Sequence, residues 1–239
     1  MLHIIVQPTY THLGKITVCA DIPSTRHISG QTRCSALVLK PKSNLHDIND
    51  GMADMPSIII RRPKRHERAQ IHALFDVVIR HTFELEGVGD EFELIGELIA
   101  DQQNLIDLDI DTDGQQCFFL VAAHKSQVVG TICVRPCSDI IRECADRDTS
   151  GMLEIGSVYV LPELQGKGIA KQLLGRMYMT LKGKGVKEFW LDSGYDIAKQ
   201  VWRNILGKPS IIMKDYWAEG VDHHLWFRKL DDVDVEDKA

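Results

Sequence analysis

A glycine-rich segment near the middle of the chain has the residue types that bind phosphate groups. It runs from Gln165 to Ala170 with the sequence QGKGIA. Glycine has no side chain, so a ligand can approach the backbone closely. The first amides of a helix lack partners within the helix and lie at the positive end of its dipole, so a pyrophosphate could accept several N–H bonds there. Lys167 and Lys171 could add positive charge nearby.

The apolar pattern changes from that of a strand to that of a helix across this segment. Leu153–Val160 is a short apolar run with β-branched residues, closed by Pro162, which predicts a strand that ends in a turn. Beyond Gly168 the apolar residues recur at spacings of three and four, which predicts a helix that reaches Lys182. The spacing of the glycines fits neither a Walker loop nor the G-x-G-x-x-G fingerprint, so these two kinds of nucleotide site are excluded.

The segment resembles the acyl-CoA-binding signature of the GCN5-related N-acetyltransferases (GNAT), Gln/Arg-x-x-Gly-x-Gly/Ala. The matching residues are Gln165, Gly168 and Ala170, and the strand before them and the helix after them are the context that the family has. The resemblance covers about three quarters of the chain. It implies an α/β (α+β) acyltransferase fold, in which a mixed, mostly antiparallel central sheet has a splayed parallel strand pair and is flanked by helices.

The resemblance also implies acetyl-CoA as cosubstrate and no metal. The loop would cradle the pyrophosphate, and the backbone of the preceding strand would hold the pantetheine arm and the thioester carbonyl. The implied contacts are Val158, Tyr159, Val160, Gln165, Gly166, Lys167, Gly168, Ile169 and Ala170. The side chain of Tyr159 itself is expected to pack or to lie at the entrance.

Acetyl transfer to an amine needs a group that takes the amine proton and an acid for the leaving thiolate. Glu154 lies eleven residues before Gln165, the spacing at which some family members place a glutamate base. Burial beside the sulfur would raise its pKa toward a useful value. The alternative is that Glu154 only pairs with a neighbouring cation or lies at a strand edge, and the sequence leaves both open.

The acid is harder to assign. Many family members carry Asn-x-x-Ala-x-x-x-Tyr on the helix after the fifth strand. Alignment on Ala198 puts Tyr195 at the asparagine position and Trp202 at the tyrosine position, and an indole cannot supply the proton. Tyr216 is our candidate, against a simple packing role for that residue. Tyr195, or departure of the thiolate without an acid, are the alternatives.

Composition narrows the class of protein. The chain has 239 residues, 44% of them hydrophobic, and a formal net charge of -6, which disfavours nucleic acid as partner. No stretch is long and apolar enough for a membrane span and no basic signal region begins the chain, so we expect a cytoplasmic protein. The six cysteines form no C-x-x-C pair, which indicates reduced structural thiols rather than zinc. His223 and His224 point to opposite faces of an expected strand and do not chelate one metal readily.

Three segments are expected: an extension (1–56), the N-acetyltransferase domain (57–230) and an acidic tail (231–239). The extension has no motif, and it could be β-rich, bind a partner or lack order. Within the domain, Gly130 is expected to mark a bulge or a close approach. The other expected elements are strands at Ile58–Ile60, Cys117–Ala123, Gln127–Val134, Val186–Leu191, Ile211–Tyr216 and His223–Leu230, helices near Arg65–Arg80, Glu91–Gln103 and Tyr195–Leu206, and a loop at Ser138–Ser150.

The expected function is transfer of an acetyl group to a primary amine by direct attack with general-base assistance. The acceptor could be a small molecule or a peptide. The segment from Glu84 to Asp113 is acidic and has no lysine or arginine, so it could attract a cationic amine, although a solvated helix face plus an acidic loop is the interpretation that we favour. A non-catalytic CoA-binding or regulatory module is the alternative function. The oligomeric state stays open, a homodimer included.

Overall fold

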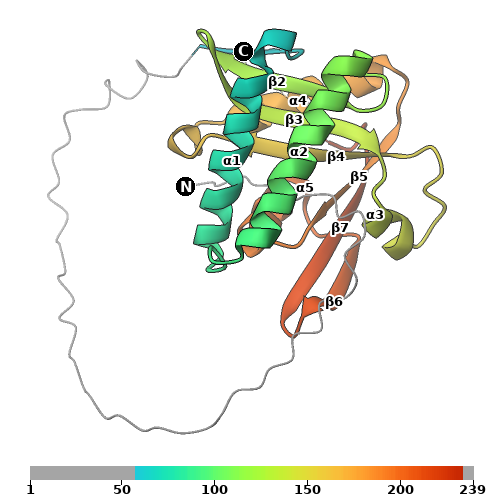
Figure 1. Ribbon diagram of the computed structural model, residues 1–239. Helices are drawn as coiled ribbons and strands as arrows, with labels where there is room; N and C mark the ends of the chain where they lie inside the picture. The colour runs from blue at the N-terminus through green and yellow to red at the C-terminus, as the bar shows by residue number, and fades with distance from the viewer. Residues whose placement is uncertain (1–56, 234–239) are drawn as a thin grey trace, which may run out of the picture.

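The computed structural model describes residues 57–233 (Figure 1). The expected extension, residues 1–56, and most of the acidic tail, residues 234–239, lie outside the described residues.

The domain is built on one seven-stranded sheet in the order β1-β2-β3-β4-β5-β7-β6 (Figure 1). Neighbouring strands are antiparallel except β4 and β5, which are parallel. The predicted mixed sheet with a single parallel pair is therefore confirmed. The strands are β1 (Ile58–Arg61), β2 (Phe118–His124), β3 (Gln127–Pro136), β4 (Leu153–Val160), β5 (Glu188–Ser193), β6 (Ile211–Ala218) and β7 (Val221–Lys229).

Helices flank both faces of this sheet. Tyr159 of β4 packs on Phe75 of α1, whereas its neighbour Val160 lies with Leu173 of α4 around Gly130. Since successive strand residues point to opposite faces, α1 and α4 lie on opposite sides. Helix α2 lies beside α1 (Figure 1). The helices are α1 (Arg68–Leu85), α2 (Phe92–Thr112), α3 (Asp139–Cys144), α4 (Ile169–Gly183) and α5 (Asp196–Leu206).

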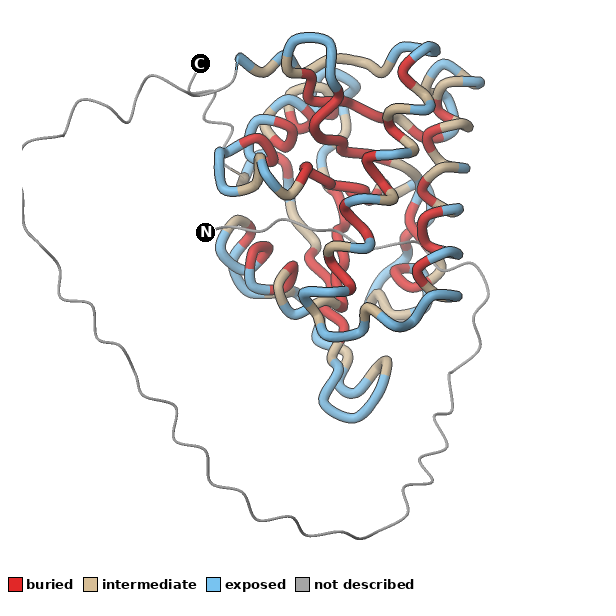
Figure 2. The backbone as a smooth tube through the Cα atoms, turned by 60° about the vertical axis from the view of Figure 1, so that its left-hand side comes forward, coloured by how far each residue is buried: buried red, intermediate tan, exposed pale blue. Residues whose placement is uncertain are grey.

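Strand β4 crosses the centre of the core. Every residue from Glu154 to Val160 is buried, and the buried residues gather along the sheet beneath the helices (Figure 2). The predicted apolar face of the first helix is confirmed, since α1 buries Ile71, Leu74, Phe75, Val78 and Ile79. The predicted bounds of β4 are also confirmed.

Strands β4 and β5 pair over a very short distance. Its one paired position joins Glu154 to Trp190, whereas β5 pairs with β7 along its whole length. Strand β4 also contains a bulge, because one more residue separates Gly156 from Tyr159 than separates their partners on β3. Ser157 takes up the bulge with a positive φ of 50°. Beyond Glu154 the β4 edge that faces β5 therefore lacks strand partners among the described residues.

The second helix is longer than predicted and extends to Thr112 instead of Gln103. Its last turns include three aspartates of the acidic segment, each of which is paired with a basic side chain from the start of the domain. The pairs are Asp107 with Arg68, Asp109 with Arg62, and Asp111 with Arg65 and Arg68. Those charges are neutralised locally, so this half of the segment does not form the field that could attract an amine.

Two further differences from the predictions affect the surroundings of the site. Helix α3 lies inside the expected loop, because Ile140 and Ile141 are buried and Ile141 packs with Trp190. Strand β5 begins and ends two residues later than predicted, at Glu188 and Ser193. The shift brings two polar residues, Asp192 and Ser193, into the buried part of the sheet.

Gly130 lies next to a bulge and at a close approach of two strands, in line with the expectation for this residue. The register of β2 and β3 shifts beside it, and a Cβ atom there would come within 2.9 Å of the carbonyl oxygen of Tyr159. We expect Gly130→Ala to lower the free energy of unfolding in urea by about 1–3 kcal/mol, because backbone must move. Gly175→Ala, at a position of α4 with open space around it, is the matched control and should be neutral or stabilising. Equal stability of Gly130→Ala and wild type would contradict the close approach.

Candidate active site

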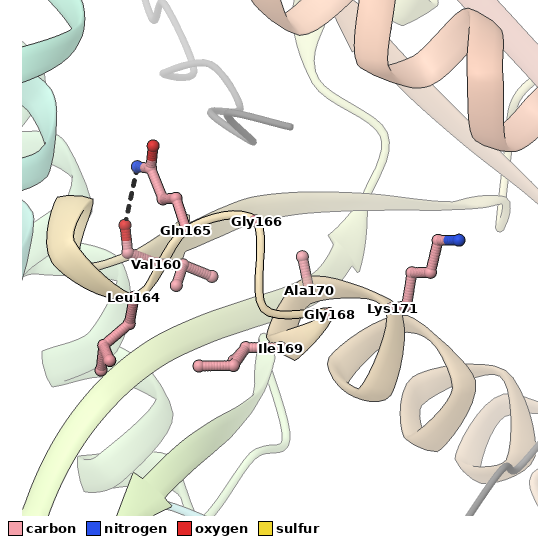
Figure 3. Close-up of a pocket in the computed structure, with 8 residues that line it drawn as sticks. All are labelled: Val160, Leu164, Gln165, Gly166, Gly168, Ile169, Ala170 and Lys171. Carbon is pink, nitrogen blue, oxygen red and sulfur yellow. Dashed lines mark hydrogen bonds between the residues drawn. The ribbon is translucent and has the colours of Figure 1, made fainter. Parts of the chain in front are cut away.

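The glycine-rich segment forms a pocket in the connection between the end of β4 and the start of α4. A 3-10 turn, η2 (Pro162–Leu164), follows β4, and the chain then passes through Gly166 and Gly168, with φ of 76° and 78°. Only glycine adopts such values readily, which explains both glycines. The pocket is lined by Val160, Leu164, Gln165, Gly166, Gly168, Ile169, Ala170 and Lys171 (Figure 3).

Gln165 ties this loop to the end of β4. Its side-chain amide Nε2 donates to the carbonyl oxygen of Val160 at 3.0 Å (Figure 3). Of the two lysines, Lys171 lines the pocket, while Lys167 is exposed and does not line it. Lys171 is therefore the better placed to meet a phosphate, and the expected contact of Lys167 stays a prediction.

Gly168 is the N-cap residue of α4, and its missing side chain leaves space. No atom lies within 4 Å of the position that a Cβ would take there. The amides that begin α4 have no intrahelical acceptors and open onto this space. The residues present fit the pyrophosphate of acetyl-CoA, since an anion would find free N–H donors and the positive end of the helix dipole without a side chain in the way.

Val160 lines this pocket and also ends the β4 edge that has no strand partner toward β5; we call this unpaired edge the opening between β4 and β5. Val158, Tyr159 and Val160 bury their side chains, so only their backbone groups can meet a ligand. Ser193 Oγ on β5 and Trp202 Nε1 on α5 are buried and have no hydrogen-bond partner among the described residues. Orphaned polar atoms of this kind call for a partner, and the amide-rich pantetheine arm of acetyl-CoA is chemically suited to supply one.

The bulge in β4 is held from the helix side. Ser157 Oγ donates to Oε1 of Gln102, a fully buried residue of α2, at 2.6 Å, and the carbonyl oxygen of Ser157 accepts from Thr131 Oγ1 at 2.8 Å. These two bonds fix the strand at the residue with positive φ. The backbone beside the bulge is therefore rigid before any ligand arrives.

Glu154 forms a buried ion pair. Its carboxylate pairs with Arg135 on β3 and accepts the backbone N–H of Ser138 at 2.7 Å, and its side chain is 2% exposed. Burial raises its pKa and Arg135 opposes that rise. Both oxygens are thus engaged, which matches the alternative that Glu154 pairs with a neighbouring cation. Its role as a base stays a prediction.

A second carboxylate lies beside it, on β5. Asp192 Oδ2 is 3.0 Å from Nε2 of His223, which is fully buried, and Nδ1 of His223 accepts the indole N–H of Trp217 at 3.1 Å. An indole nitrogen only donates, so the proton of the imidazole must be on Nε2, where it donates to Asp192. The two histidines do face opposite ways: His224 packs on Trp226 instead.

Sequence reasoning missed Asp192, because the strand was expected to end at Leu191. The available signal was its place at the carboxyl end of a parallel strand, the edge where ligands bind in sheets of this kind.

Tyr216 lies next to His223 and Trp217. Its ring is 5.4 Å from that of His223 and packs edge-on against Trp217. Burial raises the pKa of Tyr216, and the nearby Cys144 and Glu143 raise it further, so the phenol keeps its proton at neutral pH. Its assignment as the acid stays a prediction. Trp202, at the position where the family has a tyrosine, is fully buried in the core.

Within residues 57–233 no three histidine, cysteine or acidic side chains come together as a metal site would require. The four cysteines of this part, Cys117, Cys133, Cys137 and Cys144, are free thiols. No helix in the same residues is long and apolar enough to cross a membrane.

Comparison with protein families matches residues 78–207, more than half of the chain, to the acetyltransferase (GNAT) family. The chain therefore belongs to the GNAT acetyltransferases, which are acetyl-CoA-dependent acyltransferases. Comparison with curated protein sequences returned no significant match.

Solved structures of the same family share the fold. A GNAT-family protein from Desulfovibrio desulfuricans has a TM-score of 0.55 and 14% identity, and the match covers 73% of this chain and 99% of that chain. The PaiA N-acetyltransferase of Thermoplasma acidophilum, in complex with coenzyme A, has a TM-score of 0.53 and 20% identity over 72% and 99%. YncA of Salmonella typhimurium, with acetyl-CoA, has a TM-score of 0.53 and 19% identity over 76% and 99%.

Proposed function

We propose that this protein transfers the acetyl group of acetyl-CoA directly to a primary amine. The observation that carries the proposal is that Val160 both lines the glycine pocket and ends the unpaired β4 edge of the opening. The pocket offers amides for a pyrophosphate at Gly168, and the opening offers backbone groups at Val158–Val160 for the arm that follows. An elongated ligand with an anionic end and an amide-containing chain suits both parts.

When bound, acetyl-CoA supplies an acetyl group that is activated as a thioester. Beyond Glu154 the β4 edge toward β5 has no strand partner among the described residues, so its backbone N–H groups could donate to the thioester oxygen, on which negative charge grows during attack. Because Gln102 and Thr131 hold the bulge, these donors need little rearrangement. The residues of the opening thus orient the acetyl group and stabilise charge.

A group of carboxylates around Arg135 suits a cationic acceptor. Asp101 and Glu97 lie one turn apart on α2, and burial, with the charge of Glu97, raises the pKa of Asp101. Arg135 is near enough to counter that rise. Two further carboxylates, those of Glu154 and Asp192, also interact with Arg135. A protonated amine would be attracted to this group and would lose a proton there before attack.

Binding of the cosubstrate can be tested by thermal unfolding with CoA and acetyl-CoA. At 100 times the dissociation constant, a ligand of the folded state alone adds about 2.7 kcal/mol, which raises the midpoint by roughly 5–10 °C for a domain of this size. A rise with both ligands, followed by thiol release when amines are added, is the expected result. A rise without thiol release for any amine would favour the non-catalytic CoA-binding module, and no rise would refute the role of the pocket.

A further inference from the structure

We infer that Asp192, held in place by His223 and Trp217, is the residue that accepts the proton of the attacking amine. The inference rests on the proposed acetyl transfer and names the catalytic carboxylate within it. Two carboxylates lie at the β4–β5 junction, Glu154 and Asp192, and their surroundings differ in a way that decides between them.

The first difference is availability. Glu154 has both oxygens engaged, by Arg135 and by the Ser138 N–H, and its side chain is 2% exposed. The side chain of Asp192 is 12% exposed, and only its Oδ2 has a hydrogen-bond partner among the described residues. Its Oδ1 is therefore free to meet an incoming group, whereas Glu154 would first have to break a buried ion pair.

The second difference is position along the opening. Glu154 is at the one position where β4 pairs with β5, opposite Trp190. Asp192 is two residues beyond Trp190, so it lies across the opening from Gly156, next to the bulge at Ser157. Parallel strands run in the same direction, so two residues beyond Glu154 and two beyond Trp190 give Gly156 and Asp192 as neighbours. Both lie beyond the one paired position of the two strands. Asp192 is thus at the place where the acetyl group would be oriented.

The third observation is the chain of hydrogen bonds behind Asp192. The indole N–H of Trp217 fixes the tautomer of His223, and Nε2–H of that imidazole donates to Oδ2. This arrangement holds the carboxylate in one orientation, with the N–H of the imidazole on Oδ2 and Oδ1 left toward the opening. His223 and Trp217 are positioning residues, because neither needs to touch the acceptor.

Other ionisable groups surround Asp192 on every packed element. Besides burial, which acts first, its charge contributes to raising the pKa values of Glu154 on β4, Cys137 after β3, Cys144 on α3 and Tyr216 on β6. Arg135 on β3 also interacts with the charge of Asp192, and Glu143 on α3 acts on Tyr216. These groups therefore lie around Asp192.

The proton transfer balances as follows. The amine is attracted as its ammonium form and gives the ammonium proton to water at the site, so that the attacking nitrogen is the free base. As its nitrogen forms a bond to the acetyl carbon and the carbon–sulfur bond breaks, the nitrogen becomes acidic, and Asp192 Oδ1 accepts one N–H proton. The products are the acetylated amine and the CoA thiolate, which takes a proton from solvent, and Asp192 returns its proton to solvent.

The test is Asp192→Asn in the full chain, with thiol release from acetyl-CoA measured for 1,4-diaminobutane, lysine and a lysine-containing peptide. We expect kcat to fall by about 100-fold or more, with the rise of the thermal midpoint in CoA unchanged, because asparagine can still accept from His223. Retention of the wild-type rate to within about threefold would overturn the inference. Absence of thiol release from the wild type would instead refute the proposed function, and the inference with it.

Two further variants separate chemistry from folding. Asp192→Ala should recover activity when formate is added, since a small carboxylate can occupy the vacated space beside His223, and no structural role predicts such rescue. Trp217→Phe frees Nδ1 of His223 to take a proton, so its pH–rate profile should differ from that of wild type. An Asp192→Ala variant that binds CoA but is not rescued, together with an unaltered pH profile of Trp217→Phe, would contradict the inference even if Asp192→Asn failed to fold.

Discussion

Replacement of Glu154 by glutamine is expected to lower the free energy of unfolding by about 3 kcal/mol, because it leaves Arg135 as an unpaired buried charge. The arginine side chain is 13% exposed and the glutamate 2%, so water cannot take the place of the carboxylate. Urea unfolding of the variant measures the loss. Any fall in turnover would then have two causes, lost structure and lost chemistry, so the single variant alone does not identify a base.

The matched control removes both charges. Arg135→Gln/Glu154→Gln keeps an acceptor for the Ser138 N–H and should recover stability to within about 1 kcal/mol of wild type, since a buried pair contributes little beyond the desolvation of its own charges. If the pair is structural, turnover should return together with stability. A stable double variant that binds CoA and does not turn over would assign the proton to Glu154 after all.

Replacement of Gly168 by aspartate is expected to weaken binding of CoA by about 10- to 100-fold, the cost of losing charge-assisted bonds at one phosphate. The new carboxylate would lie at the N-terminus of α4, in the space that the pyrophosphate would occupy. Aspartate tolerates positive φ better than most residues, so the variant should fold. Isothermal titration with CoA measures the change.

Gly168→Asn is the control for shape, because asparagine has almost the same size and the same tolerance of positive φ. It should weaken binding less than aspartate does, and the difference between the two variants is the contribution of charge. Raised salt should narrow that difference by screening. Equal affinity of the aspartate variant and wild type would contradict a phosphate site in this pocket.

The sequence predicted those parts of the fold whose signal is local. The strand Leu153–Val160, the glycines with positive φ and the apolar face of α1 each follow from residue type and period, and the structure confirms them. The end of α2 was missed because its aspartates read as a solvated loop. They are stabilised in the helix by arginines that are far away in sequence.

The catalytic side of the site depends on contacts that no local pattern encodes. Glu154 was identified from its spacing, yet whether it is free or paired depends on Arg135, which is brought to it by the pairing of β3 with β4. Asp192, His223 and Trp217 come from three different strands. Because the predicted end of β5 was two residues too early, Asp192 was not recognised as part of the strand.

The most direct test of acetyl transfer is a paired measurement on the wild-type protein with acetyl-CoA and the amine panel. Thiol release and the mass of the acetylated amine are followed in the same reaction. We expect the two products in equal amounts and both to be reduced in Gly168→Asp. Binding of CoA with neither product, for every amine, would contradict the account and favour a module that only binds CoA.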